Sequence, residues 1–156
     1  MIPLGDDVLI SIDGQQFFEH KLDEVIISSE KVAHVQIGNS LEHALLVLTK
    51  SGYSSIPVLN PKFQLLGLIS TSMILDRILG LERIEFERLN NMKVEEVMCK
   101  EFPLLKTTDT LAKGLESVID HPFVCVVGDE NTFEGILTRR AILKQVNKSV
   151  RRYNKH

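Results

Sequence analysis

Two nonapeptides decide the fold: GLISTSMIL at residues 67–75 and GILTRRAIL at residues 135–143. Both start with glycine, pass through apolar residues to a hydroxyl side chain, and continue into a second apolar pattern. A strand that runs directly into a helix gives such a pattern, with Ser70 and Thr138 as the residues that cap the helix N-terminus. The chain is therefore predicted to contain a duplicated unit.

Two further pairs of segments extend the duplication in the same order. KLDEVII at residues 21–27 is similar to KVEEVMC at residues 93–99, and SLEHALLVLTKSG from Ser40 is similar to TLAKGLESVIDHP from Thr110. The second pair predicts an amphipathic helix in each copy, and the apolar runs around NPKF and GDEN predict a hairpin after it. Each copy is thus predicted to be a β-α-β-β-α unit, and the fold class to be α+β.

The repeat also predicts the domain boundaries. The segment GLERIEFERLNNMK between the copies is charged at helical spacing, which predicts a connecting helix with a solvated face. The basic C-terminal run is predicted to be a solvated helix end, with docking of a protein or nucleic acid as the alternative. We expect an N-terminal helical or irregular segment (1–20), repeat 1 (21–80), the connecting helix (81–92), repeat 2 (93–148) and a basic tail (149–156).

Composition excludes several classes of function. The 156 residues are 44% hydrophobic and carry 18 basic and 21 acidic side chains, a net charge of -3 that gives no field for nucleic acid or an anionic membrane. Without an apolar run of about 20 residues or a secretory signal pattern, we expect a cytoplasmic protein. The histidines are scattered, and no phosphate-binding loop or nucleophile motif occurs. We expect no enzyme activity, catalytic residue, metal or cofactor, and Cys125 within FVCVV is expected to be a core residue.

Arg139 and Arg140 are the unusual feature of the second copy. Positive charge in the first turn of a helix opposes the helix dipole, at about 0.3–1 kcal/mol for each exposed charge. A guanidinium fork fits phosphate oxygens, and the helix N-terminus offers N–H groups beside it. A solvated helix start is the alternative. Because the first copy has Thr71 and Ser72 at the equivalent positions, we expect only one of the two sites to bind an anionic ligand.

The segment SEKVAHVQI at residues 29–37 alternates like an edge strand. Lys31 is a candidate for a phosphate, the small Ala33 allows a flat base to approach, and His34 is a candidate for a base edge. An exposed lysine that protects a sheet edge and a half-buried core histidine are the alternatives.

The segment SGYSSIPV, which enters the middle strand of the first copy, is a candidate for a second wall of the site. It offers an aromatic face, hydroxyls and backbone groups to a base. Packing of the tyrosine against the preceding helix is an equal alternative. The candidate residues are Tyr53, Ser54, Ser55, Ile56 and Pro57.

The duplicated units, the IPV of the middle strand and the endings in glycine, two apolar residues and a hydroxyl resemble a pair of CBS domains over about residues 21–148. The resemblance implies a Bateman module, in which two repeats pack about a pseudo-twofold axis and leave two clefts for adenine nucleotides. Such modules usually form homodimeric discs and regulate other proteins. Members that bind adenosine have an aspartate for the ribose three residues after the hydroxyl, where this chain has Met73 and Ala141.

Several longer strings, among them KVAHVQIGNSLEHALLVLTKSGY, GLERIEFE and FEGILTRR, resemble the stand-alone two-CBS proteins of Firmicutes that bind the second messenger cyclic di-AMP. The likeness implies that Lys31, Ala33 and Arg140 contact the ligand, with Arg139 nearby. Thr138, which precedes the arginine pair, is a further candidate for the ligand site. It also implies signal transduction through protein partners, notably the (p)ppGpp synthetase and pyruvate carboxylase. AMP and ATP are expected to be weaker ligands. An AMP- or ATP-sensing module and a ligand-free dimerisation module are the alternatives.

Overall fold

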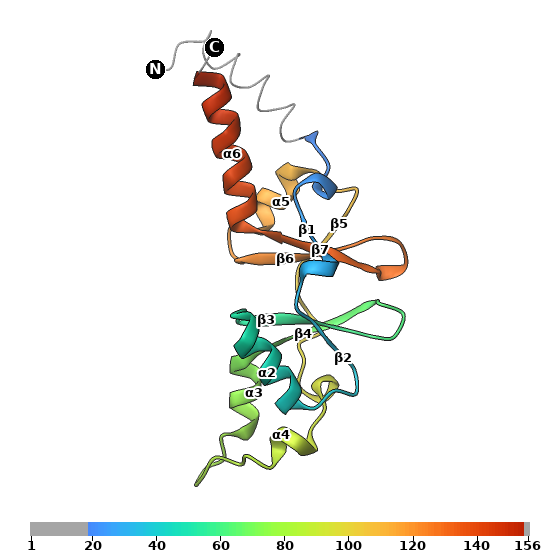
Figure 1. The fold of residues 1–156 in the computed structure, drawn as a ribbon, viewed down its shortest axis with the longest axis vertical. Coiled ribbons are helices and arrows are strands. Elements are labelled where there is room, and N and C mark those ends of the chain that lie inside the picture. Colours follow the sequence, from blue (N-terminus) through green and yellow to red (C-terminus); the bar gives the residue numbers. More distant parts are fainter. Residues whose placement is uncertain (1–18, 155–156) are drawn as a thin grey trace. The chain divides into compact units, whose positions relative to one another are not determined.

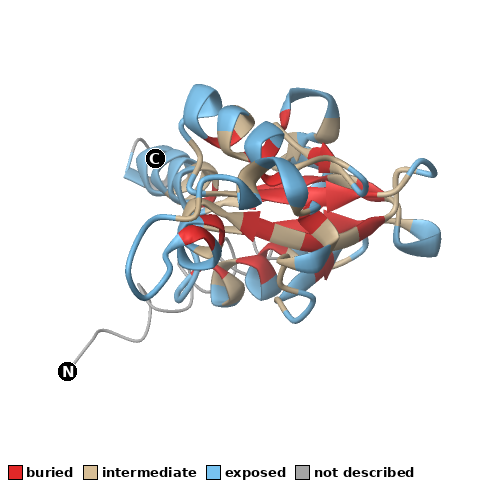
Figure 2. Cartoon of the chain, turned by 90° about the horizontal axis from the view of Figure 1, so that it is seen from below, coloured by how far each residue is buried: buried red, intermediate tan, exposed pale blue. Residues whose placement is uncertain are grey.

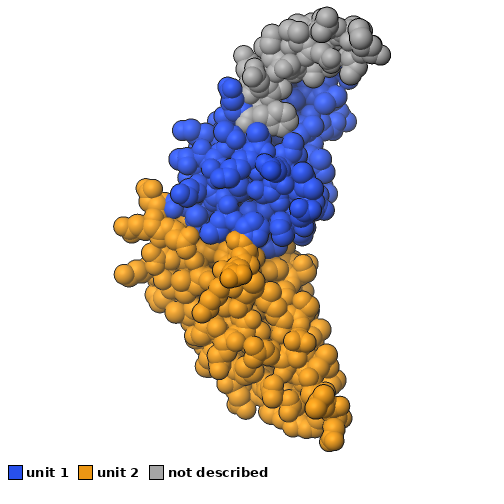
Figure 3. Space-filling view, turned by 180° about the vertical axis from the view of Figure 1, so that it is seen from behind, with its two compact units in different colours: residues 1–30, 103–128, 134–156 blue, residues 31–102, 129–133 orange. Residues whose placement is uncertain are grey.

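The computed structural model describes residues 19–154, and the chain falls into two compact units, coloured separately in Figure 3. Unit 1 comprises residues 1–30, 103–128 and 134–156, and unit 2 comprises residues 31–102 and 129–133. The predicted N-terminal segment therefore lies almost wholly outside the described residues. The compact units do not follow the order of the repeats, because the opening segment of each repeat belongs to the unit that the other repeat mainly forms.

Unit 2 is a three-stranded sheet with two helices packed on it (Figure 1). The middle strand β3 is parallel to β2 and antiparallel to β4. Apolar residues of the sheet and of both helices form one core, to which Val94 also belongs. The elements are β2 (Val35–Gln36), α2 (Leu41–Ser51), β3 (Ser55–Leu59), β4 (Leu65–Ser70), α3 (Thr71–Ile78), α4 (Arg88–Asn91), η3 (Val94–Glu96) and η4 (Asp129–Asn131), and η2 (Ser29–Lys31) spans the boundary with unit 1.

Unit 1 repeats this plan with a four-stranded sheet in the order β1-β7-β6-β5. Strand β1 is antiparallel to β7, and β5 is parallel to β6. Leu22 lies in its core together with residues of α5, α6 and three of the strands. The elements are η1 (Leu22–Glu24), β1 (Ile27–Ser28), β5 (Leu104–Lys106), α5 (Leu111–Ser117), β6 (Phe123–Val127), β7 (Phe133–Thr138) and α6 (Arg139–Asn154).

The local predictions are largely confirmed. The Ser40 hydroxyl accepts a hydrogen bond from the backbone N–H of His43 at 3.1 Å, which caps α2, and Ser70 caps α3 in the same way. The pairs β3–β4 and β6–β7 occupy the places of the predicted hairpins. Buried residues concentrate on the strands and on the helix faces that cover them (Figure 2).

Glycines at equivalent positions of the two repeats make room for the exchanged opening segments. A Cβ atom at Gly135 would lie 2.1 Å from the carbonyl oxygen of Ile27, and one at Gly67 would lie 2.9 Å from the carbonyl oxygen of Cys99. Leu22 and Val94, which precede these carbonyls in the two opening segments, are both completely buried. The first residue of each nonapeptide is therefore where the opening segment of the other repeat packs.

One predicted helix differs from the structure. The connecting helix is wrong for most of 81–92, since only Arg88–Asn91 is helical. The preceding residues form a turn in which the N–H of Gly80 donates to the carbonyl of Arg83 at 2.9 Å. Because Leu81 is fully exposed, this segment has no apolar stripe that could hold a longer helix against a core. Helix α6, in contrast, continues to Asn154, through most of the predicted tail.

Candidate functional site

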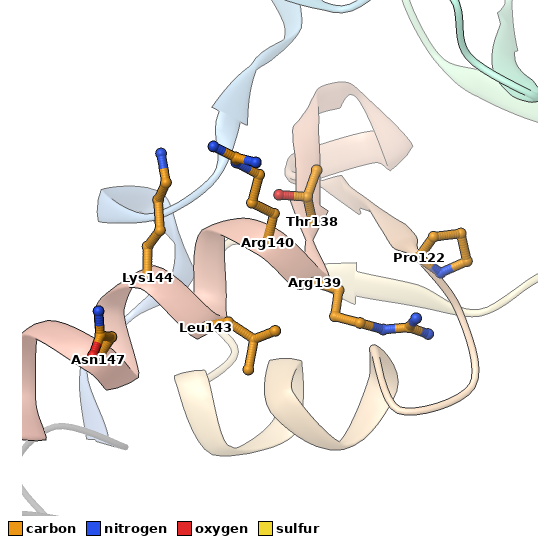
Figure 4. Close-up of a pocket in the computed structure, with 7 residues that line it drawn as sticks. All are labelled: Pro122, Thr138, Arg139, Arg140, Leu143, Lys144 and Asn147. Atoms are coloured by element: carbon orange, nitrogen blue, oxygen red, sulfur yellow. The ribbon is translucent and has the colours of Figure 1, made fainter.

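The arginine pair begins α6, where β7 ends. The Thr138 hydroxyl accepts a hydrogen bond from the N–H of Ala141 at 3.0 Å, as the N-cap prediction requires. Arg139 and Arg140 are the first two residues of the helix. Their side chains diverge, with Arg139 directed toward the Pro122 side and Arg140 directed away from it (Figure 4). The two guanidinium groups therefore have different surroundings.

Arg139 joins the start of α6 to the end of α5. Its Nε donates a hydrogen bond to the carbonyl oxygen of Val118 at 2.8 Å, and its Nη2 donates to that of Ile119 at 3.2 Å. The last carbonyls of a helix have no N–H donor within the helix and carry partial negative charge, so a cation that donates to them is stabilising. The charge that seemed misplaced against the dipole of α6 is thus well placed for the dipole of α5.

Arg140 lies on an open cavity of about 720 Å³ in unit 1. Lys144, one helical turn further along α6, has its ammonium group on the same side (Figure 4). Among the ion pairs of residues 19–154, none involves Arg140 or Lys144. Two cations one turn apart suit an anionic ligand. The apolar Leu143, which also lines the cavity, points away from both of them (Figure 4). The residues that line the cavity are Pro122, Thr138, Arg139, Arg140, Leu143, Lys144 and Asn147.

The equivalent turn of unit 2 has no cation. The Ser70 hydroxyl accepts from the N–H of Met73 at 3.1 Å and lies 3.0 Å from the hydroxyl of Ser72. Met73 and Ala141 hold the places of the ribose aspartate, so neither turn offers a carboxylate to a sugar. The two turns therefore differ in charge as the sequence predicts.

The predicted edge strand over residues 29–37 is wrong. Ser29–Lys31 is a turn of 3₁₀ helix, and only Val35–Gln36 is a strand. The buried residues here, Val32 and Val35, are three positions apart. This spacing differs from the two-residue period of a strand with one buried face. Lys31 is exposed at the end of η2, whereas Ala33 and His34 are half-buried in the loop before β2.

His34 is fixed by two contacts within unit 2. Its Nδ1 lies 3.1 Å from the carbonyl oxygen of Val32, and its ring meets the ring of Phe63 edge-on, with centroids 5.4 Å apart and an interplanar angle of 79°. Sequence reasoning missed Phe63, which lies in the β3–β4 turn with φ 64°. NPKF did predict a turn, but nothing in those letters indicates that its phenylalanine packs on a histidine far back along the chain.

The candidate wall at the start of β3 is only partly accessible. Tyr53 packs against the core of unit 2, which agrees with the packing alternative. Ser54 is exposed and Ser55 half-buried, but Ile56 and Pro57 are buried, so Ile56 can offer a ligand only backbone groups. Proline is tolerated in this middle strand because the pairing with β2 begins only at Val58.

The predicted ligand residues are thus divided between the units. The three residues of unit 1 line one cavity at the start of α6, and the residues of unit 2 lie on the segment before β2 and at the start of β3. Unit 1 holds Thr138, Arg139 and Arg140, and unit 2 holds Lys31, Ala33, His34, Tyr53, Ser54, Ser55, Ile56 and Pro57.

Other site types find little support in the described part of the chain. Among residues 19–154 no three histidine, cysteine or acidic side chains cluster as metal ligands would. No helix in this range is both long and apolar enough to cross a membrane. Cys125 is buried in β6, as predicted, and its burial raises the pKa of the thiol to about 12.

Comparisons with known proteins agree with this architecture. The model of the CBS domain matches residues 23–80 and 94–148. Cyclic di-AMP receptor B of Bacillus subtilis is 54% identical over 147 residues, which cover 94% of this chain and 100% of the relative.

Solved structures are similar as well. A Bacillus anthracis protein of unknown function that contains CBS domains is 66% identical, with a TM-score of 0.79 over 86% of this chain and 98% of the other. Listeria monocytogenes CbpB in complex with c-di-AMP is 59% identical, with a TM-score of 0.77 over 83% of this chain and 97% of the other. The duplicated unit, its two sheets and these matches show that the chain belongs to the CBS domain family.

Proposed function

We propose that this protein is a non-catalytic receptor for cyclic di-AMP. The observation that carries the proposal is that the two arginines have different roles: one is bonded to backbone carbonyls and the other faces a cavity. Arg139 is held by the carbonyls of Val118 and Ile119, whereas Arg140 faces a cavity and forms none of the ion pairs of residues 19–154. The similarity to Cyclic di-AMP receptor B over nearly the whole chain supports the same ligand.

The chemistry of the ligand fits the residues. Cyclic di-AMP carries two phosphodiesters and two adenines, so it needs cations and apolar or stacking surfaces. Arg140 would bind phosphodiester oxygens with its guanidinium fork. Lys31 is a second candidate for a phosphate contact. Ala33 would leave space for an adenine. AMP and ATP, which present terminal phosphates and rely on a ribose acceptor in adenosine-binding members, would bind more weakly.

Ligand occupancy would act through other proteins. CBS domains are regulatory rather than catalytic modules, and we propose that this receptor works in the cytoplasm by binding partners such as the (p)ppGpp synthetase or pyruvate carboxylase. We further propose a homodimer. Its support is the exposure of Leu75 on α3 and Leu143 on α6, equivalent leucines that expose 42% and 54% of their surface. Such leucines are suited to burial against a second copy.

Isothermal titration calorimetry tests the ligand. We expect cyclic di-AMP to bind with one molecule per chain and more tightly than AMP, ATP or S-adenosylmethionine. Tighter binding of AMP, or two cyclic dinucleotides per chain, would contradict the proposal.

Arg140→Met should weaken binding about tenfold to a hundredfold, the usual worth of a hydrogen bond to a charged group. Arg151→Met, an exposed arginine further along the same helix, is the matched control and should leave affinity unchanged. Equal effects of the two substitutions would mean that only overall charge matters.

A further inference from the structure

The half-buried His34 has a defined tautomer. A carbonyl oxygen only accepts hydrogen bonds, so the 3.1 Å contact between Nδ1 and the Val32 carbonyl requires a proton on Nδ1. In the neutral ring, Nε2 then carries a lone pair and is a hydrogen-bond acceptor. The backbone of unit 2 therefore decides what this side chain can recognise.

The orientation of the ring is defined by Phe63. The edge-to-face contact, at 5.4 Å between centroids and 79° between planes, is a favourable geometry for two aromatic rings. Phe63 is itself packed against the ring of Phe133, at 6.2 Å between centroids. His34 thus lies at the end of a row of three rings, and rotation about its side-chain bonds would break both of its contacts.

The position of Phe63 is set by the β3–β4 turn, in which its N–H donates to the carbonyl of Asn60 at 2.9 Å. Phe63 has φ 64°, a left-handed conformation that is uncommon for a bulky residue and has to be stabilised by its surroundings. The Asn60 side chain supplies part of that support, since its Oδ1 accepts the N–H groups of Lys62 and Gln64. Phe63 also accepts, through its carbonyl, the N–H of Phe133 at 2.9 Å. These hydrogen bonds fix the turn and, with it, the place of the Phe63 ring.

We propose that His34 selects adenine, accepting a hydrogen bond at Nε2 from the 6-amino group of one base, with Phe63 as the residue that positions it. The inference rests on the proposed function and deepens it. Adenine presents a donor at its 6-position, whereas hypoxanthine presents a carbonyl oxygen there. In the same pose, a hypoxanthine base would set its oxygen against the lone pair of Nε2. The site therefore discriminates against 6-oxo purines.

The test compares two ligands, cyclic di-AMP and cyclic di-IMP, by calorimetry. The measured quantity is the ratio of their dissociation constants, because damage to the fold would weaken both ligands equally and leave the ratio unchanged. For the unmodified protein we expect cyclic di-AMP to be preferred. His34→Phe, which retains a flat ring against Phe63 but has no acceptor, should reduce this preference by about tenfold to a hundredfold.

Variants of Phe63 separate positioning from stability. Phe63→Leu should reduce the preference for adenine as well, whereas the conservative Phe63→Tyr, which keeps an aromatic ring, should retain it. Combining Phe63→Leu with His34→Phe should cause no further loss of preference, because both act through one hydrogen bond. Lys62→Ala, at an exposed neighbour in the same turn, is the control and should leave the ratio unchanged.

The tautomer can be checked without any ligand. Nitrogen-15 NMR of the neutral imidazole should show a protonated Nδ1 and a non-protonated Nε2, and Phe63→Leu should remove the ring-current shift of the His34 protons. A protonated Nε2, or an adenine preference unchanged in His34→Phe, would overturn the inference. If the unmodified protein bound neither cyclic dinucleotide, the proposed function itself would fail. Binding of both with a ratio insensitive to His34 would refute only the selection of adenine.

Discussion

Replacing three glycines by alanine, one at a time, would separate two costs that the fold imposes on glycine. Gly52 has φ 79° and no atom within 4 Å of the place that an added methyl group would take, so Gly52→Ala introduces conformational strain alone. At Gly67 the methyl group would lie 2.7 Å from the Met98 sulfur and 2.9 Å from the Cys99 carbonyl oxygen. At Gly135 it would lie 2.1 Å from the Ile27 carbonyl oxygen, with φ 155° as well.

These distances set the magnitudes. Gly52→Ala should lower the free energy of unfolding by about 1–2 kcal/mol, the cost of a left-handed residue with a side chain. Gly67→Ala should cost about 1–3 kcal/mol as overpacking, since the flexible Met98 side chain can move aside but the Cys99 carbonyl, 2.9 Å from the methyl group, also has to shift. At Gly135 no side-chain movement helps, and β1 would have to leave β7. Losing two ladder pairs at about 1 kcal/mol each, together with part of the burial of Ile26, gives about 3–4 kcal/mol.

Urea denaturation followed by circular dichroism measures the three values, and hydrogen exchange locates the damage. In Gly135→Ala the amides of residues 27 and 28 should lose protection, while those of α2 in the other unit should keep theirs. In Gly52→Ala β1 should be unaffected. A loss for Gly135→Ala no larger than that for Gly52→Ala would refute the close approach of Ile27 to β7.

Three shorter predictions concern other parts of the molecule. Arg139→Met should lower the free energy of unfolding by about 1–2 kcal/mol, because it removes the hydrogen bonds to the carbonyls at the end of α5. Arg140→Met should leave the free energy of unfolding nearly unchanged, and urea titrations that show the reverse would refute the different roles of the two arginines. Burial raises the pKa of Cys125 from 9.0 to about 12, so the stability that the protonated thiol contributes should be complete below pH 9.0 and fall as pH rises toward 12. Unfolding curves of the unmodified protein and of Cys125→Ala, measured below and above pH 9.0, test this: the difference in unfolding free energy between them should change only above pH 9.0. Leu143→Asp should convert the proposed dimer to monomer in light-scattering chromatography, and an unchanged mass would place the dimer contact elsewhere.

Features that depend on neighbours in sequence were predictable. Ser40, Ser70 and Thr138 could be assigned as helix caps because a cap contacts only the next turn of its own helix. The hairpins likewise follow from short-range alternation and turn residues. The charge difference between the two helix starts was also visible, because the duplication supplies an internal comparison between Arg140 and Ser72.

Features that depend on distant contacts were not predictable. Leu22 and Val94 are equivalent in the repeats, so the sequence alone does not distinguish packing within a repeat from exchange between repeats. The role of Arg139 depends on carbonyls about 20 residues earlier in the chain, which have no side-chain signature. The same holds for Phe63, whose left-handed backbone is sustained by Asn60 and whose ring reaches His34.

The exchange of opening segments also sets an order of events during synthesis. Unit 2 draws almost all of its chain from residues 31–102, so nearly its entire core has left the ribosome before the second half is made. Unit 1 combines residues 1–30 with residues from 103 onward. Leu22 is thus among the first core residues to emerge, yet the apolar side chains that bury it are among the last. The nascent chain therefore keeps this leucine exposed while unit 2 is completed, and the first opening segment presents an apolar, aggregation-prone surface during translation.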